Sequence, residues 1–178
     1  MSRRAVFFDR DGVVNLSPGP GYVLRWEDFH FSPGIIEALA LCRTRGYAVV
    51  LATSQQGVGK KLMTQADLDF IHARMQAHLR EHGAEFDGIY ACTCLKTDPG
   101  CLCRKPSPEM LERAAVEHDL DLSRSLIVGD ADRDIEMGTN AGVPLTIRIE
   151  SENPHLVTAT HTLPDTTGLA TLLATLLD

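Results

Sequence analysis

The chain lacks the features that direct a protein to a membrane or to a nucleic acid. None of its apolar runs approaches the roughly 20 residues that a transmembrane helix needs. Positive charge is scarce, because 17 Lys and Arg residues face 24 Asp and Glu residues and leave a formal net charge of −7. An acidic balance disfavours partners that are held by bulk electrostatics. We therefore expect neither a nucleic acid nor a membrane surface as a partner.

The chain also lacks a secretory signal, internal repeats, low-complexity segments and an interdomain linker. Residues 1–4 lead straight into the first apolar segment and leave no place for the apolar part of a signal peptide. We therefore expect a cytoplasmic protein whose five cysteines are reduced. Its 178 residues are enough for a full hydrophobic core, which predicts a single domain spanning residues 1–178.

Two aspartates follow the first apolar segment at its end. Ala5–Phe8 is a short apolar run typical of a buried strand, and Asp9, Asp11 and Gly12 come directly after it. Both carboxylates leave the same end of this strand within a few ångströms of each other. Such a pair repels, so it needs a cation, a shared proton or two different roles. Taken alone, the motif fits a polar turn as well as it fits a functional site.

Apolar strand-like runs alternate with amphipathic helical segments along the whole chain. This alternation predicts a three-layer α/β domain with a largely parallel central sheet. Ligands bind such sheets at the carboxyl ends of the strands. The predicted strands are residues 5–8, 47–52, 88–91, 125–128 and 144–149, with a further edge strand within 158–163. The predicted helices are residues 32–46, 64–81, 107–118, 135–142 and 166–177.

Further polar residues follow other predicted strands and would meet at the same sheet edge. Asp9, Asp11 and Asp130 offer oxygen ligands that suit Mg²⁺. Thr53 and Lys105 offer a hydrogen-bond donor and a positive charge that suit a phosphate. Together they indicate phosphoryl transfer, in which one aspartate attacks phosphorus and a second one moves the proton.

The order of these motifs resembles that of the haloacid dehalogenase-like (HAD) hydrolases. The resemblance covers nearly the whole chain and implies the family's Rossmann-like fold. It implies that Asp9 is the nucleophile and Asp11 the general acid/base, while Thr53 and Lys105 hold the phosphoryl group. The motifs that carry it are strand-Asp9-x-Asp11-Gly12, strand-Thr53, Lys105-Pro106 before a helix, and strand-Gly129-Asp130-x-x-x-Asp134.

The same resemblance implies a catalytic Mg²⁺ ion. Its ligands would be the side chains of Asp9 and Asp130 and the backbone carbonyl of Asp11. Asp134 would support these ligands without binding the ion itself.

A closer resemblance is to the small-capped branch that contains heptose 1,7-bisphosphate phosphatases and histidinol-phosphate phosphatases. It rests on Phe8–Asn15, the cysteine loop Cys92–Cys103 and the following Arg104-Lys105-Pro106. The chain has no room for a large cap domain between the first two motifs. The branch implies a monomer with an open site, in which Ser54, Arg104 and Lys105 contact the substrate.

The substrate implied by this branch is a small phosphorylated metabolite. D-glycero-D-manno-heptose 1,7-bisphosphate, losing its 7-phosphate, is the leading expectation. Histidinol phosphate and other small sugar or nucleotide phosphates are alternatives. The same motifs allow two other interpretations. One is a zinc-loop binding protein without turnover, and the other is a polynucleotide end phosphatase.

Four cysteines form a Cys-x-Cys pair, a six-residue spacer and a second Cys-x-Cys pair. They are Cys92, Cys94, Cys101 and Cys103. Four thiolates can close a tetrahedral zinc site, although buried free thiols and disulfides are alternatives. In the family that the chain resembles, this loop carries structural Zn²⁺, with a histidine where Cys94 stands here. We therefore expect Zn²⁺ that shapes the loop and directs Arg104.

Several remaining polar and aromatic residues receive less specific expectations. Ser54-Gln55-Gln56 departs from the Asn-Gln sequence that commonly follows the threonine in this family. Residues 18–26 are expected to form a flap over the site. Tyr22 and Trp26 could anchor this flap or form walls of the substrate site, and we expect them to be anchors. The histidines of the predicted helices are expected to be surface or boundary residues, namely His72, His78, His82 and His118.

Overall fold

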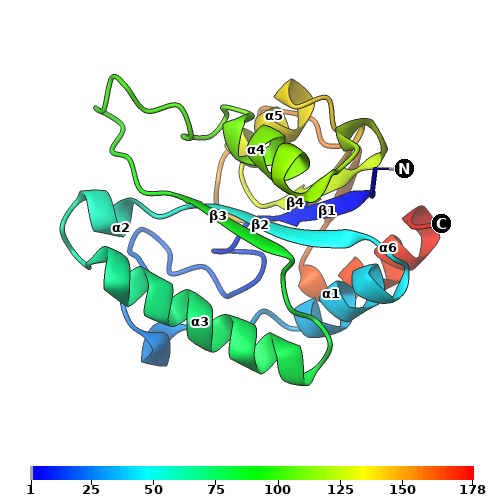
Figure 1. Ribbon diagram of the computed structural model, residues 1–178, viewed down its shortest axis with the longest axis horizontal. Coiled ribbons are helices and arrows are strands. Elements are labelled where there is room, and N and C mark those ends of the chain that lie inside the picture. Colours follow the sequence, from blue (N-terminus) through cyan, green and yellow to red (C-terminus); the bar gives the residue numbers. More distant parts are fainter. Residues whose placement is uncertain (1) are drawn as a thin grey trace.

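The computed structural model of the protein describes residues 2–178 and confirms the predicted α/β architecture (Figure 1). Its sheet has the strand order β3-β2-β1-β4-β5-β6, and every neighbouring pair is parallel. The expected edge strand is present as β6. The strands are β1 (Ala5–Phe8), β2 (Ala48–Ser54), β3 (Gly88–Cys92), β4 (Leu126–Gly129), β5 (Leu145–Ile149) and β6 (His161–Leu163).

Helices cover both faces of this sheet and make the three layers. In Figure 1, α4 and α5 lie above the sheet, whereas α1, α3 and α6 lie below it. Among residues 2–178, no helix is both long enough and apolar enough to cross a membrane. The helices are α1 (Ile35–Thr44), α2 (Gln56–Gly59), α3 (Gln65–Glu81), α4 (Glu109–His118), α5 (Asp132–Asn140) and α6 (Leu169–Leu176).

The alternation of side chains along β1 explains why its whole sequence is apolar. Val6 and Phe8 belong to the core beneath the sheet, with residues of α1, α3 and α6. Ala5 and Phe7 belong to the core above it, with residues of α4 and α5. All four side chains are 0% exposed. A central parallel strand is buried on both faces, so it needs a continuous apolar run.

The start of α3 shows how local sequence sets a helix boundary. Thr64 caps α3 by accepting from the backbone N–H of Asp67, whose carboxylate in turn accepts from the backbone N–H of Thr64. This reciprocal pairing satisfies two backbone donors at the start of α3. By contrast, Gln56–Gly59 lies outside every predicted helix and forms the single turn α2. A four-residue helix with two glycines gives too little periodicity to be recognised from sequence.

The chain reverses its direction of travel across the sheet between β1 and β4. It runs outward from β1 to β2 and β3, and then returns to pair β4 with the other side of β1. Open parallel sheets bind ligands beyond the carboxyl ends of the strands at such a switch point. Asp9 follows β1 and Asp130 follows β4, so both lie at this point.

Candidate active site

Three carboxylates and one lysine form a buried cluster at the carboxyl ends of β1 and β4. Asp9, Asp130 and Asp134 each place a carboxylate oxygen within 4.8 Å of the others. The Nζ atom of Lys105 donates to Oδ1 of Asp9 and to Oδ1 of Asp134, both at 2.7 Å. The side chain of Lys105 is 1% exposed. Residues distant in sequence therefore meet as the motif order predicted.

The electrostatics of this cluster leave it short of positive charge. Burial, and next the carboxylate of Asp134, raise the pKa of Asp9 to about 6. Burial, and next Asp9, raise the pKa of Asp130 to about 7. Burial alone would lower the pKa of Lys105, but the carboxylates of Asp134 and Asp9 raise it overall. One ammonium group thus faces three carboxylates, so a further cation would stabilise their ionised forms.

Gly12 allows the turn after β1 to approach this cluster. Its φ angle is +89°, a left-handed conformation that favours glycine. A Cβ atom at this position would lie 2.5 Å from Oδ2 of Asp130, which is closer than van der Waals contact permits. The glycine of the Asp-x-Asp-Gly motif is therefore required both by the turn and by the neighbouring carboxylate.

Asp11 lies beside the cluster and is held by three neighbouring side chains. Its Oδ1 atom accepts from Nδ2 of Asn15 at 3.0 Å and from Nη2 of Arg10 at 3.1 Å. Its Oδ2 atom accepts from Nε2 of Gln55 at 2.9 Å. The same amide nitrogen donates to Oγ1 of Thr53, also at 2.9 Å. Gln55 therefore links the end of β2 to the turn after β1.

His72 contradicts the expectation of a surface or boundary residue. It is 7% exposed, and its Nε2 atom lies 3.2 Å from Nη1 of Arg10. Burial, and next the charge of Arg10, lower the pKa of His72 from 6.5 to about 4. Its position on α3 gave no sign of this, because the buried cation it contacts lies 62 residues away in the sequence.

The lowered pKa of His72 predicts a pH dependence of stability. When a group has a lower pKa in the folded protein than in the unfolded protein, the folded protein is more stable above the unfolded-state pKa than below it. Stability is therefore lost as the pH falls from the unfolded-state pKa to the folded-state pKa. The wild-type protein should therefore lose free energy of unfolding between pH 6.5 and pH 4 relative to His72→Gln. Chemical denaturation across this range measures it, with His78→Gln on the same helix as control. Parallel profiles for wild type and His72→Gln would contradict the assignment.

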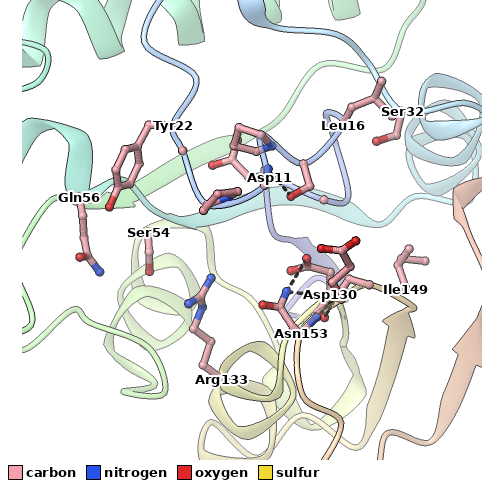
Figure 2. A pocket seen from close by; sticks show the side chains of 18 of the residues that line it. Asp11, Leu16, Tyr22, Ser32, Ser54, Gln56, Asp130, Arg133, Ile149 and Asn153 are labelled. Carbon is pink, nitrogen blue, oxygen red and sulfur yellow. Dashed lines mark hydrogen bonds between the residues drawn. The ribbon is translucent and has the colours of Figure 1, made fainter.

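A cleft of about 1290 Å³ opens next to Asp11 and Asp130. Figure 2 shows both side chains in its wall, with Ser54 and Arg133 nearby. The flap residues from Leu16 to Tyr22 also line it, as does the loop after β5. Asn153 of that loop donates to Oδ2 of Asp130 at 3.0 Å. Sequence reasoning gave this loop no role, because its polar residues match none of the motifs.

The flap aromatics divide between the two roles considered for them. Trp26 is an anchor as expected, since its ring stacks on Phe29 with centroids 5.2 Å apart. Tyr22 was also expected to be an anchor, but it lines the cleft. Its ring lies 5.2 Å from Nζ of Lys60, a second cleft residue.

Two further arginines, Arg104 and Arg133, occupy different places near the site. Arg104, which was expected to contact the substrate, is not among the residues that line the cleft, and neither are Asp9, Thr53 and Lys105. Its guanidinium donates to the side-chain oxygen of Gln56, with Nη2 at 3.1 Å, once the Gln56 amide is oriented to satisfy its neighbours. Arg133, at the start of α5, does line the cleft (Figure 2). Its place directly before Asp134 was the signal that could have identified it.

The four loop cysteines meet in space as their spacing predicted. Their Sγ atoms all lie within 4.8 Å of one another, and none forms a disulfide. The Sγ–Sγ distances are 3.7 Å for Cys92–Cys101 and 3.8 Å for both Cys94–Cys103 and Cys101–Cys103. A tetrahedron with Zn–S bonds of about 2.3 Å has edges of about 3.8 Å. The donor set therefore fits Zn²⁺.

Comparisons with known proteins give the chain its family. A family model described as HAD-hydrolase-like matches residues 102–148. A Helicobacter pylori protein named D-glycero-beta-D-manno-heptose-1,7-bisphosphate 7-phosphatase is 38% identical over 86% of each chain. A Burkholderia mallei protein, named as the phosphatase of the alpha anomer, is 37% identical over 84% of this chain and 81% of its own. The chain belongs to the HAD-like phosphatase family.

A solved structure supports the same assignment for the whole fold. The D,D-heptose 1,7-bisphosphate phosphatase from B. bronchiseptica, crystallised with magnesium and phosphate, superposes with a TM-score of 0.86. It is 31% identical and covers 97% of this chain and 98% of its own. This HAD-like phosphatase is therefore a phosphoric monoester hydrolase with the predicted Rossmann-like fold. As predicted, residues 2–178 contain no large cap domain.

Proposed function

We propose that this HAD-like phosphatase removes the 7-phosphate of D-glycero-D-manno-heptose 1,7-bisphosphate through an aspartyl-phosphate. The observation that carries the chemistry is the cluster of Asp9, Asp130 and Asp134 around Lys105, beside a cleft large enough for a sugar bisphosphate. The names of the relatives support the substrate. They include both anomers, so the chemistry proposed here applies to either.

In the first step, a carboxylate oxygen of Asp9 attacks the phosphorus atom. An O–P bond forms to Asp9 while the bond from phosphorus to the sugar oxygen breaks. Asp11 enters this step protonated and donates its proton to the departing alkoxide, which leaves as the alcohol. Lys105 contacts Oδ1 of Asp9 and orients the nucleophile, and Thr53 at the end of β2 holds the phosphoryl oxygens.

In the second step, a water molecule attacks the phosphorus of the aspartyl-phosphate. Asp11, now ionised, accepts a proton from this water as the bond between phosphorus and Asp9 breaks. Inorganic phosphate leaves, and both aspartates return to their starting states.

The donors around Asp9 suit Mg²⁺ as the cofactor. They are carboxylate oxygens, which hard divalent cations prefer. Within residues 2–178, Asp130 has no ion pair within 4.0 Å, so its charge is free to face a cation. The carboxylates of Asp9 and Asp130 and the backbone carbonyl of Asp11 would hold the ion, and Asp134 would support these ligands without binding the ion itself. When bound, Mg²⁺ neutralises the charge of the phosphoryl oxygens.

Cations in the cleft support a substrate with a second phosphate. Lys60, Lys96 and Arg133 all line it, together with Ser54. Arg104 would act on this group through Gln56, which also lines the cleft. The formal net charge of −7 supports a small metabolite rather than nucleic acid or a membrane surface as the partner, and we propose that the protein works as a monomer.

The experiment is a phosphate-release screen with and without Mg²⁺. The panel contains both anomers of heptose 1,7-bisphosphate, hexose bisphosphates and histidinol phosphate. We expect Mg²⁺-dependent release of one phosphate, fastest from a heptose bisphosphate. Faster release from histidinol phosphate would contradict the substrate, and equal release without Mg²⁺ would contradict the cofactor.

Zinc in the cysteine loop is a separate prediction. The loop from Cys92 to Cys103 has few apolar residues of its own, so the metal would supply most of its folding energy. We expect about one zinc per chain in purified protein, with loss of the metal and of order in the loop after Cys101→Ser. Elemental analysis and thiol titration measure this, and Cys42→Ser is the control because Cys42 lies in the core. Zinc-free protein with four titratable loop thiols would rule the site out.

A further inference from the structure

One buried cation in the active-site turn has no part in the chemistry above. Arg10 is the largest of the fully buried side chains, at 0% exposed. Burying a guanidinium is costly unless it is paired and hydrogen-bonded. Among residues 2–178, Asp11 is the one carboxylate that forms an ion pair with it, through Nε at 3.3 Å and Nη2 at 3.1 Å from Oδ1. The pair thus joins a buried cation directly to the proposed acid/base.

The far side of the same guanidinium is held by α3. Its Nη1 atom lies 3.2 Å from Nε2 of His72. Arginine has only donors, so Nε2 accepts this bond and His72 carries its proton on Nδ1. The ring of Phe29 lies 5.9 Å from the Arg10 guanidinium carbon and covers another part of it. These contacts leave the guanidinium little freedom to rotate.

The orientation of Asp11 depends on this arrangement. Its other donors, Asn15 and Gln55, are neutral amides, each of which also bonds to a second acceptor. Arg10 is the charged donor: its Nε and Nη2 atoms both reach Oδ1, and Nη2 also lies 3.4 Å from Oδ2, so the guanidinium restrains the carboxylate at more than one point. Without His72, the buried guanidinium would have an unsatisfied N–H and would shift to find another acceptor.

We propose that Arg10 and His72 are positioning residues that hold the Asp11 carboxylate in the orientation needed for proton transfer. This inference rests on the proposed role of Asp11 as acid/base. It predicts that disturbing either residue slows the proton-transfer steps selectively and leaves attack by Asp9 intact.

The test compares two substrates that differ in their need for an acid. A heptose bisphosphate releases an alkoxide that must be protonated, whereas 4-nitrophenyl phosphate releases a stable phenolate. The variants are His72→Leu and Arg10→Met, with His72→Gln as the conservative replacement that restores an acceptor. His78→Leu is the matched control, since His78 lies on the same helix and stacks on Phe31 away from Arg10.

We expect His72→Leu and Arg10→Met to lower kcat for the heptose bisphosphate by about 10- to 100-fold, part of the usual contribution of acid/base catalysis, with little change in KM. With 4-nitrophenyl phosphate, stopped-flow measurements on His72→Leu and Arg10→Met should show a burst of about one nitrophenolate per enzyme, followed by slow turnover. The burst arises because attack needs no acid, whereas hydrolysis of the aspartyl-phosphate still needs Asp11. His72→Gln and His78→Leu should behave like wild type.

Two results would overturn the inference. One is His72→Leu with wild-type kcat on the heptose bisphosphate. The other is an equal loss in the burst and the steady phase, which indicates general damage to the fold. If Arg10→Met does not fold, His72→Leu and His72→Gln still decide the matter. If the wild-type enzyme does not hydrolyse heptose bisphosphate, the proposed function is wrong. The burst with 4-nitrophenyl phosphate tests the positioning role independently of that outcome.

Discussion

Asp9→Asn is expected to abolish phosphate release, by roughly 10⁴-fold or more, because the amide cannot form the acyl-phosphate. The fold should be retained, since an amide oxygen can still accept from Nζ of Lys105. The substitution also removes one of three crowded carboxylates, so thermal stability should not fall. Steady-state phosphate release, thermal unfolding and zinc content measure these outcomes.

The matched control for this variant is Asp165→Asn. Asp165 lines the same cleft but belongs to the segment after β6 and not to the cluster around Lys105. It should retain nearly full turnover. If Asp9→Asn released phosphate at a comparable rate, Asp9 would not be the nucleophile.

Lys105→Met should have the next largest effect, because it removes the one ammonium that Asp9 and Asp134 share. Leaving buried carboxylates without their partner costs about 3–5 kcal/mol of folding stability. Turnover should also be lost, since the nucleophile is no longer oriented. Urea unfolding in the absence of Mg²⁺ gives the first quantity, and phosphate release gives the second.

The exposed Lys61 provides the control, because Lys61→Met removes the same charge without touching the cluster. Its free energy of unfolding should lie close to that of wild type. A Lys105→Met protein as stable as Lys61→Met would show that the cluster does not depend on the lysine for its charge balance.

The sequence carried enough information to predict the parts of the site that follow strands. Asp9, Thr53 and Asp130 were placed correctly, because parallel strands bring their carboxyl ends to one edge of a sheet. The cysteines were also brought together as expected, since their spacing alone restricts the loop that joins them.

The contacts around these residues could not be predicted in the same way. His72 reaches Arg10 from α3, and Asn153 reaches Asp130 from the loop after β5. Both contacts depend on how elements pack, which periodicity does not encode. The direction of Arg104 toward Gln56 likewise depends on α2, a helix too short to be recognised from its own sequence.

The central claim is that turnover passes through a phosphoryl group on Asp9, and trapping that group tests it most directly. In Asp11→Asn, attack by Asp9 on 4-nitrophenyl phosphate remains possible while hydrolysis of the intermediate lacks its base. Intact mass spectrometry after rapid quenching should therefore show one added phosphoryl group, and peptide sequencing should place it on Asp9. Finding no adduct while this variant continues to release nitrophenolate, or an adduct on another residue, would contradict the account.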